Sequence, residues 1–230
     1  MIAQAKLVVV NGLGFEGWID RLIQAAGYRG KVVTASTGIE SLQRPQTEGE
    51  PSRGVGLDPH AWQDLGNALR YVDNIAQALS DVDPAGAGIY RSNAAKYKQA
   101  ISALDGEIRK TFNALPPERL KVVTTHDAFA YFSRAYGIRF ISPVGVNTDA
   151  EPSAADLGRI IKQIRREHIP AVFMENISDP RLLERIREES GARVGGTLFS
   201  DALSRSEGPA PTYLDMMRYN VKTLADALSN

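Results

Sequence analysis

The sequence of 230 residues contains no cysteine. Disulfides, thiolate metal sites and cysteine nucleophiles are therefore excluded, whereas reducing and oxidising compartments are both compatible with the chain. An excess of charge is also absent, because 27 acidic side chains balance 27 basic ones. No net field attracts the protein to nucleic acid or to a membrane surface, so any specificity must come from a local site.

Long apolar runs are missing as well. A membrane-spanning helix needs about 18 or more apolar residues in succession, and the sequence has no such run. The first six residues lack the apolar segment of a signal peptide, so an exported protein would have lost its signal beforehand. Serine-hydrolase Gly-x-Ser-x-Gly, phosphate-binding Gly-Lys-Ser/Thr and His-Glu-x-x-His motifs are absent too. Fixed-period repeats are also absent, which favours a globular fold.

Hydrophobic periodicity predicts alternating strands and helices in two regions. The first region has predicted strands at residues 6–10 and 31–34, helices at 15–26 and 68–79, and a loop at 40–56. The second has predicted strands at 121–125, 140–142, 171–174 and 196–199, and helices at 128–136, 154–167, 181–190 and 213–228. This alternation predicts an α/β fold of parallel sheets flanked by helices.

One unusually long helix is predicted between the two regions. An apolar stripe runs from Tyr90 to Leu115 and indicates a helix of about 30 residues. Asp83-Pro84 supplies a cap and first-turn signal, and Pro116-Pro117 ends the helix. We therefore expect an N-terminal lobe at residues 1–84, a linking helix at 85–116 and a C-terminal lobe at 117–230.

Several polar side chains lie where parallel-sheet proteins place function, just beyond the carboxyl ends of strands. His126, Glu175 and Asp201 each follow a predicted strand, and His126 is expected to begin the next helix. His60 ends the loop that leads into another helix start. Two imidazoles with one or two carboxylates suit a borderline divalent metal such as zinc, manganese or iron.

Each candidate also has a purely structural interpretation. A histidine at a helix start is often a cap or a core residue with a satisfied ring, and Asp201 alone would be a good helix N-cap. Glu175 could pair with a neighbouring basic group. His168 lies at a basic helix end, where a cation complements the helix dipole, and receives no role. Spacing alone does not decide between these interpretations and a metal site.

Several segments, in order along essentially the whole chain, resemble the zinc/manganese solute-binding family of ABC importers. The segments are Asn11-Gly-Leu-Gly14, Asp58-Pro-His-Ala-Trp62, Thr125-His-Asp-Ala-Phe-Ala-Tyr-Phe132, Glu151-Pro-Ser153, Phe173-Met-Glu175, Phe199-Ser-Asp-Ala-Leu203 and Tyr213-Leu-Asp-Met-Met217. The resemblance implies two lobes bridged by a long, rigid helix, with a metal ion held between the lobes. It implies no catalytic residue and no enzyme activity.

By position, the resemblance implies that His60 is the ligand from the N-terminal lobe, while His126 and Asp201 are the ligands from the C-terminal lobe. Glu175 and Asp127 then support the ligands from outside the coordination sphere, contrary to the strand-end expectation for Glu175. The ion, Zn²⁺ or Mn²⁺, is transported cargo, the partner is the membrane permease of the importer, and the location is the periplasm or the cell surface.

The choice between zinc and manganese stays open. The place of His126 is often a glutamate in the manganese-type branch of the family, so a histidine there favours zinc. Some zinc-type relatives carry a histidine-rich loop before the position of His60, and residues 41–56 contain no histidine, which weakens the case for zinc.

The resemblance also implies a first histidine ligand from a loop that precedes the strand at residues 6–10. Nothing before Met1 supplies this histidine, so we expect a chain that lacks an N-terminal segment and exposes an apolar sheet edge. A misassigned start, a truncated chain or a natural variant that swaps or pairs segments would each explain the difference. We expect a monomer, with a dimer or a swapped assembly as alternatives that the missing segment allows.

Two other functions are compatible with the same residues. A zinc-dependent hydrolase would use the open coordination position that two histidines and one aspartate leave, with Glu175 as general base. A surface adhesin could keep the fold without needing metal. Metal stoichiometry separates the adhesin from the transport protein, and turnover separates the enzyme.

Overall fold

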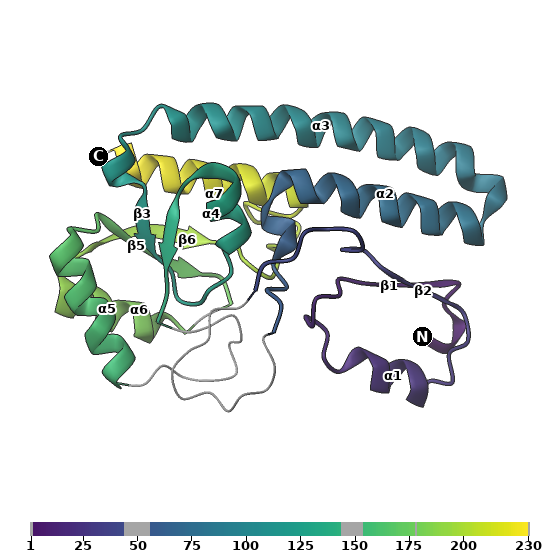
Figure 1. Cartoon of the computed structure of the whole chain (residues 1–230), viewed down its shortest axis with the longest axis horizontal. Helices are drawn as coiled ribbons and strands as arrows, with labels where there is room; N and C mark the ends of the chain where they lie inside the picture. Colours follow the sequence, from purple (N-terminus) through teal and green to yellow (C-terminus); the bar gives the residue numbers. More distant parts are fainter. Residues whose placement is uncertain (1, 44–55, 144–153, 178, 230) are drawn as a thin grey trace. The chain divides into compact units, whose positions relative to one another are not determined.

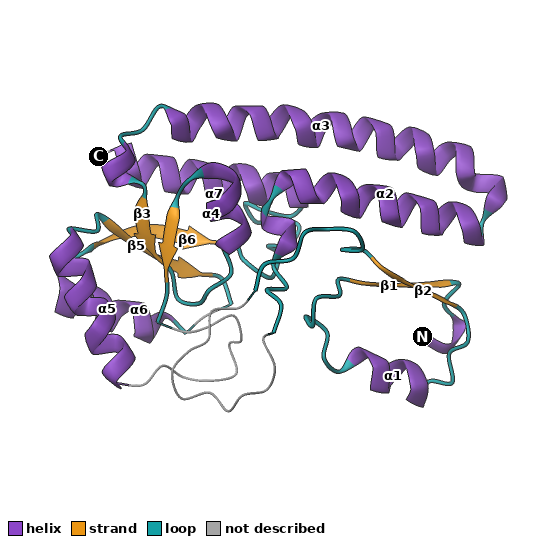
Figure 2. Cartoon of the chain, in the orientation of Figure 1, coloured by secondary structure: helices purple, strands orange, loops and turns teal. Residues whose placement is uncertain are grey.

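The computed structural model describes residues 2–43, 56–143, 154–177 and 179–229. The motif at residues 151–153 and most of the predicted loop at 40–56 lie outside these ranges. The chain divides into two compact units, residues 1–103 (unit 1) and 104–230 (unit 2). The predicted α/β fold with parallel sheets flanked by helices is confirmed (Figure 1; Figure 2).

Unit 1 is built on a two-stranded parallel sheet, β1 and β2, against which α2 packs. Its described elements are, in chain order, η1 (Ile2–Gln4), β1 (Leu7–Val10), α1 (Ile19–Ala25), β2 (Lys31–Thr34), η2 (Ala61–Gln63), α2 (Leu65–Val82), η3 (Pro84–Gly86) and the first part of α3 (Ala87–Asn113). Val9 and Val32 of the sheet are each 44% exposed.

The helix predicted from residue 15 begins only at Ile19, because the chain makes turns first. Gly12, Leu13 and Gly14 have φ angles of 84°, 56° and 83°, in the left-handed region. Glycine adopts this conformation without steric cost. At Gly12 a side chain is also excluded by space, since a Cβ would lie 2.3 Å from Cγ2 of Thr34.

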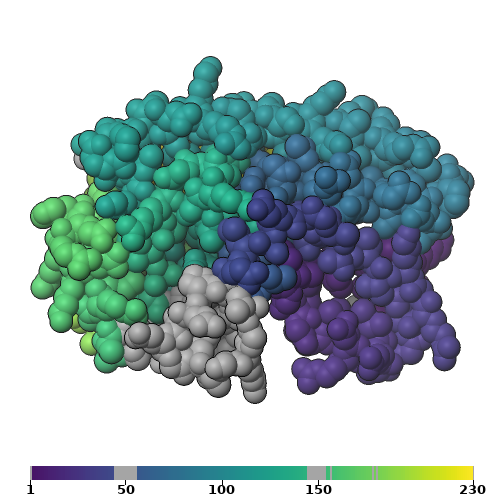
Figure 3. All heavy atoms as spheres, in the orientation of Figure 1, coloured from purple at the N-terminus to yellow at the C-terminus, as the bar shows by residue number. Residues whose placement is uncertain are grey.

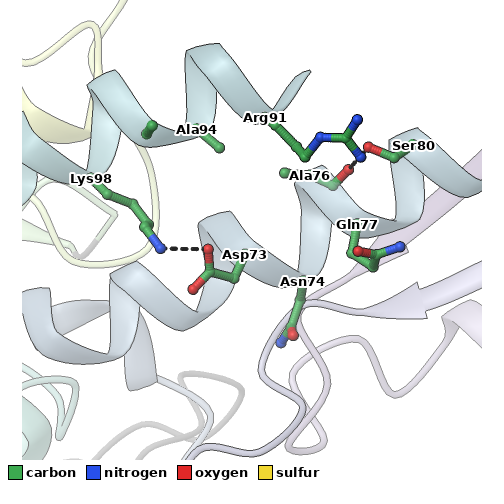
Figure 4. A pocket seen from close by; sticks show the side chains of 9 residues that line it. Asp73, Asn74, Ala76, Gln77, Ser80, Arg91, Ala94 and Lys98 are labelled. Carbon is green, nitrogen blue, oxygen red and sulfur yellow. Dashed lines mark hydrogen bonds and ion pairs between the residues drawn. The ribbon is translucent and has the colours of Figure 1, made fainter. Parts of the chain in front are cut away.

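α3 is the long helix that the apolar stripe predicts, with 27 residues. Within unit 1 it lies beside α2, to which it is joined by an ion pair of 2.6 Å between Lys98 Nζ and Asp73 Oδ1. A cavity of about 440 Å³ lies between the two helices (Figure 4). α3 also has a surface open to solvent, seen in teal in Figure 3. Its residue Ile89 is 65% exposed.

Unit 2 contains a parallel sheet with the strand order β4-β3-β5-β6. Its described elements are, in chain order, the remainder of α3, η4 (Pro117–Arg119), β3 (Lys121–Val123), α4 (Ala130–Tyr136), β4 (Arg139–Ile141), α5 (Ala154–Glu167), β5 (Ala171–Glu175), α6 (Pro180–Ser190), β6 (Arg193–Leu198) and α7 (Tyr213–Ser229).

Two packed regions hold this sheet. An aliphatic cluster joins α5 and α6 to the strands, and α7 packs on β6. An aromatic cluster joins the end of α3 to α4 and β4: Phe129 stacks on Phe140 at a centroid distance of 4.6 Å, and Phe112 meets Phe132 at 5.8 Å. The aromatic cluster includes the residues just after His126, so it fixes the chain immediately beyond β3.

β5 and β6 pair in two registers separated by a bulge. Val172 pairs with Val194, but the next residue, Phe173, pairs with Gly196, so Gly195 is an extra residue in β6. The ring of Phe173 fills the space beside Gly195, where an added Cβ would lie 2.4 Å from the ring. No described helix has both the length and the apolar character needed to cross a membrane.

Candidate metal-binding site

His126 lies in the turn after β3, and its side chain is buried. The expectation that it begins a helix is wrong, because α4 starts only at Ala130. The hydroxyl of Thr124 and the backbone N–H of Ala128 both donate to the carbonyl oxygen of His126, at 3.1 and 3.2 Å. These two bonds close a tight turn that carries the imidazole at the carboxyl end of the sheet.

Glu175, the last residue of β5, binds the His126 segment at three points. Its Oε2 lies 2.6 Å from Nδ1 of His126, and its Oε1 accepts hydrogen bonds from the His126 backbone N–H at 2.8 Å and from the Thr125 hydroxyl at 2.7 Å. The carboxylate is buried and faces β3. It therefore orients His126, and the basic group that it contacts is the imidazole of His126 itself.

Asp201 completes the group in unit 2. It follows β6, and its Oδ2 lies 3.4 Å from Nε2 of His126. Asp201 is not a helix N-cap, because the next described helix, α7, begins at Tyr213. His126 is thus flanked by two carboxylates, one on each ring nitrogen.

The charges of this group are strongly coupled. Burial alone would lower the pKa of His126, but its hydrogen bonds with Asp201 and Glu175 and their negative charges raise that pKa to about 10. Burial alone would raise the pKa of Glu175, yet the hydrogen bonds and charge of His126 hold it below its usual value. Both shifts favour the imidazolium form of His126 and the carboxylate form of Glu175 when no cation is bound.

His60 lies in unit 1, at the N-cap position of the short helix η2. Its side chain is buried, and Nδ1 lies 2.8 Å from Oδ1 of Asp58, which also accepts the His60 backbone N–H at 2.9 Å. The amide of Asn11 donates to the carbonyl of Pro59 at 2.9 Å, and Tyr71 donates to Oδ1 of that amide at 2.5 Å. The backbone that presents His60 is thus held by Asn11, just beyond β1, and Tyr71 of α2 in turn holds Asn11.

The sequence analysis did not single out Asp58 as a partner of His60. An aspartate that accepts the backbone N–H two residues further on forms an Asx turn, and Asp58-Pro59-His60 has the required spacing. The consequence for chemistry is the same as at His126. A carboxylate on Nδ1 favours the tautomer or protonation state with a proton on Nδ1, which leaves Nε2 as the nitrogen that can bind a cation.

The two remaining predictions concern Asp127 and His168. Asp127 is half-buried next to His126, and its supporting role stays a prediction. His168 is exposed just beyond α5, and it lines a separate cavity of about 580 Å³ with residues that include Arg119 and Arg193. The structure therefore brings His126, Glu175 and Asp201 together within unit 2 and places His168 apart from them.

Comparison with known proteins identifies the family. The family model described as zinc-uptake complex component A, periplasmic, matches residues 1–227. The chain is 35% identical over 222 residues to the iron-binding protein YfeA of Yersinia pestis, covering 96% of this chain and 70% of that protein. It is 32% identical over 228 residues to the manganese-binding lipoprotein MntA of Halalkalibacterium halodurans, covering 99% and 73%.

Solved structures show the same relationship. The periplasmic zinc-binding protein TroA from Treponema pallidum matches with a TM-score of 0.89 at 31% identity, over 99% of this chain and 82% of that one. The Mn-bound periplasmic metal-binding protein from Candidatus Liberibacter asiaticus matches with a TM-score of 0.85 at 28% identity, also over 99% and 82%. These matches bear out the resemblance seen in the sequence, and the chain belongs to the family of the periplasmic zinc-uptake complex component A.

Proposed function

We propose that this protein captures a divalent transition metal, zinc or manganese, outside the cytoplasm and delivers it to the membrane permease of an ABC importer. In this proposal, Nε2 of His60, Nε2 of His126 and the carboxylate of Asp201 bind the ion. Asp58 and Glu175 hold the two imidazoles. The relatives named for manganese, iron and zinc support a cargo of this class.

The arrangement around His126 is the observation that carries the proposal. One ring nitrogen is held by Glu175 at 2.6 Å, while the other faces Asp201 at 3.4 Å. A histidine that binds a metal usually donates its other ring N–H to a carboxylate or carbonyl, which fixes the ring and makes the ligand more basic. Two nitrogen donors and one carboxylate are a donor set that zinc accepts readily and manganese can also use.

The contacts of Glu175 argue against the hydrolase alternative. A general base needs a free acceptor next to the metal-bound water. The oxygens of Glu175 instead contact Thr125, the backbone of His126 and the ring of His126, and the side chain is buried. Members of the family are solute-binding proteins and not enzymes, which agrees with this geometry. Family membership likewise favours metal capture over a metal-free adhesin.

Metal analysis and titration test the proposal. Protein purified without chelator is analysed for bound metals, and zinc and manganese titrations are followed by calorimetry for the wild type, His126→Ala and His168→Asn. We expect about one equivalent of metal, strong weakening by His126→Ala and no change in His168→Asn. Asparagine is chosen for the control because residue 168 has a φ of 49°, which asparagine tolerates. Equal effects of the two substitutions would refute the assignment.

A further inference from the structure

Asn220 is a buried polar residue on an apolar face of α7. Its neighbours on that face, Met216, Met217, Val221 and Leu224, belong to the core, and Asn220 itself is only 1% exposed. A residue chosen only for packing at this position would be apolar, since burial of an amide is costly unless it is hydrogen-bonded. The contacts of the Asn220 amide therefore indicate what the residue contributes.

The amide of Asn220 binds both backbone groups of Phe199. Its Oδ1 accepts the Phe199 N–H at 2.9 Å, and its Nδ2 donates to the Phe199 carbonyl at 2.7 Å. Two bonds from one planar group fix both the position and the rotation of that peptide segment. Phe199 is the first residue beyond β6, where the strand ladder no longer holds the chain, and Asp201 comes two residues later.

A second asparagine, just beyond the end of β5, binds the same segment through residues closer to Asp201. Asn176 directly follows Glu175, its Nδ2 donates to the Ala202 carbonyl at 3.0 Å, and its Oδ1 accepts the Ser200 N–H at 3.4 Å. The backbone is therefore tied by side-chain amides both before and after Asp201. The buried amide of Asn220 makes the shorter pair of bonds.

We propose that Asn220 is a positioning residue for the metal-binding carboxylate: its paired hydrogen bonds with Phe199 hold the segment that aims Asp201 at Nε2 of His126. This inference rests on the proposed function, in which Asp201 is a ligand. Without Asn220, the backbone at residue 199 loses both partners and the Asp201 carboxylate is less well placed, so the cost appears in metal affinity as well as in folding.

A double-mutant cycle separates positioning from general stability. Zinc affinity is measured with a competing chromophoric chelator for the wild type, Asn220→Ala, Asp201→Asn and the double variant, together with the unfolding midpoint of each. Leu224→Ala, one turn further along α7 and fully buried, is the matched control for lost packing. We expect Asn220→Ala to weaken zinc binding by about tenfold to a hundredfold, the range found for residues that orient metal ligands.

In the Asp201→Asn background, we expect the Asn220→Ala effect to shrink to less than about threefold, because the carboxylate that it positions is gone. Leu224→Ala is expected to lower the unfolding midpoint and leave affinity unchanged. An Asn220→Ala variant with wild-type affinity overturns the inference, as does an equal loss in both backgrounds. If Asp201→Asn itself binds zinc as tightly as the wild type, the ligand assignment fails as well, and that result is recognised from the single variant alone.

Discussion

Metal capture should be coupled to the release of a proton from His126. The pKa of this imidazole is raised to about 10 by Asp201 and Glu175. At pH 7.5 the metal-free protein therefore holds His126 almost entirely as imidazolium. A metal ion can bind Nε2 only after the proton leaves, so binding at this pH should release about one proton from His126.

The size of the effect follows from the same pKa. Between about pH 7 and pH 9, loss of one proton per ion makes the apparent affinity rise about tenfold per pH unit, and the contribution of His126 to this slope ends above about pH 10. In Glu175→Gln one of the two carboxylates is lost, and the pKa should move towards the ordinary value of about 6.5. Asp201 still raises the pKa of His126 in this variant, so its proton release should fall below that of the wild type first at the alkaline end, near pH 9.

Two measurements test this coupling. Calorimetric zinc titrations in buffers of different ionisation enthalpy give the number of protons released, for the wild type, Glu175→Gln and an exposed control, Glu184→Gln. The ¹⁵N shifts of the His126 ring in the metal-free protein report its protonation between pH 6 and pH 10. A neutral His126 ring at pH 7.5, or the same release in the wild type and Glu175→Gln at pH 9, would refute the reasoning.

The coupling between His126 and Glu175 should also make the stability of the metal-free protein depend on pH. The pKa of His126 is raised on folding, so its contribution is fully present below about pH 6.5 and is lost as pH rises through about 10. The pKa of Glu175 is lowered on folding, so its contribution is present above its ordinary range and is lost as pH falls. The pair therefore stabilises the metal-free protein most between these limits.

Two further predictions concern the other histidine and the core. Asp58→Asn should weaken zinc binding by about tenfold to a hundredfold, because an amide at this position can donate to Nδ1 of His60 and favour the tautomer with its proton on Nε2. The exposed control Asp81→Asn should leave zinc binding unchanged. Competition titrations compare the two variants, and equal affinities would contradict a role for Asp58. Phe132→Ala should lower the free energy of unfolding by about 3–5 kcal/mol, since Phe132 is 1% exposed within the aromatic cluster. Urea denaturation measures this loss, and a change below about 1 kcal/mol would contradict the packing described.

The sequence predicted the layered fold and the polar residues at the strand ends because both depend on local patterns. Alternating apolar runs gave the strands, and the carboxyl ends of β3 and β6 placed His126 and Asp201. The resemblance implied a supporting position for Glu175, but its contacts with His126 needed the fold, since the two residues are 49 positions apart in the chain. Spacing gives no direct information about such a contact.

The sequence analysis did not single out Asp58 or Asn220, and the sequence marks these two residues to different degrees. Asp58 could have been found from the Asx-turn spacing to His60, which is a local signal. Asn220 left a weaker trace, as one amide within an apolar helical stripe, and its partner Phe199 is 21 residues away. The late start of α1 followed from three left-handed residues, and an apolar period that begins at residue 15 does not reveal backbone handedness.

The extra residue in β6 has a consequence for how this strand can change. Side chains alternate between faces along a strand, so an extra residue in a regular strand would exchange the inward and outward positions of everything that follows, whereas a bulge absorbs it. Gly195 stands between the half of β6 that pairs with the start of β5 and the half that leads to Asp201. The bulge therefore lets both halves of β6 keep the facing set by their partners in β5. A strand without Gly195 could pair Val194 and Gly196 with the same partners, so the extra residue changes the local twist and bend of the strand that leads to Asp201, and not the faces that its side chains take.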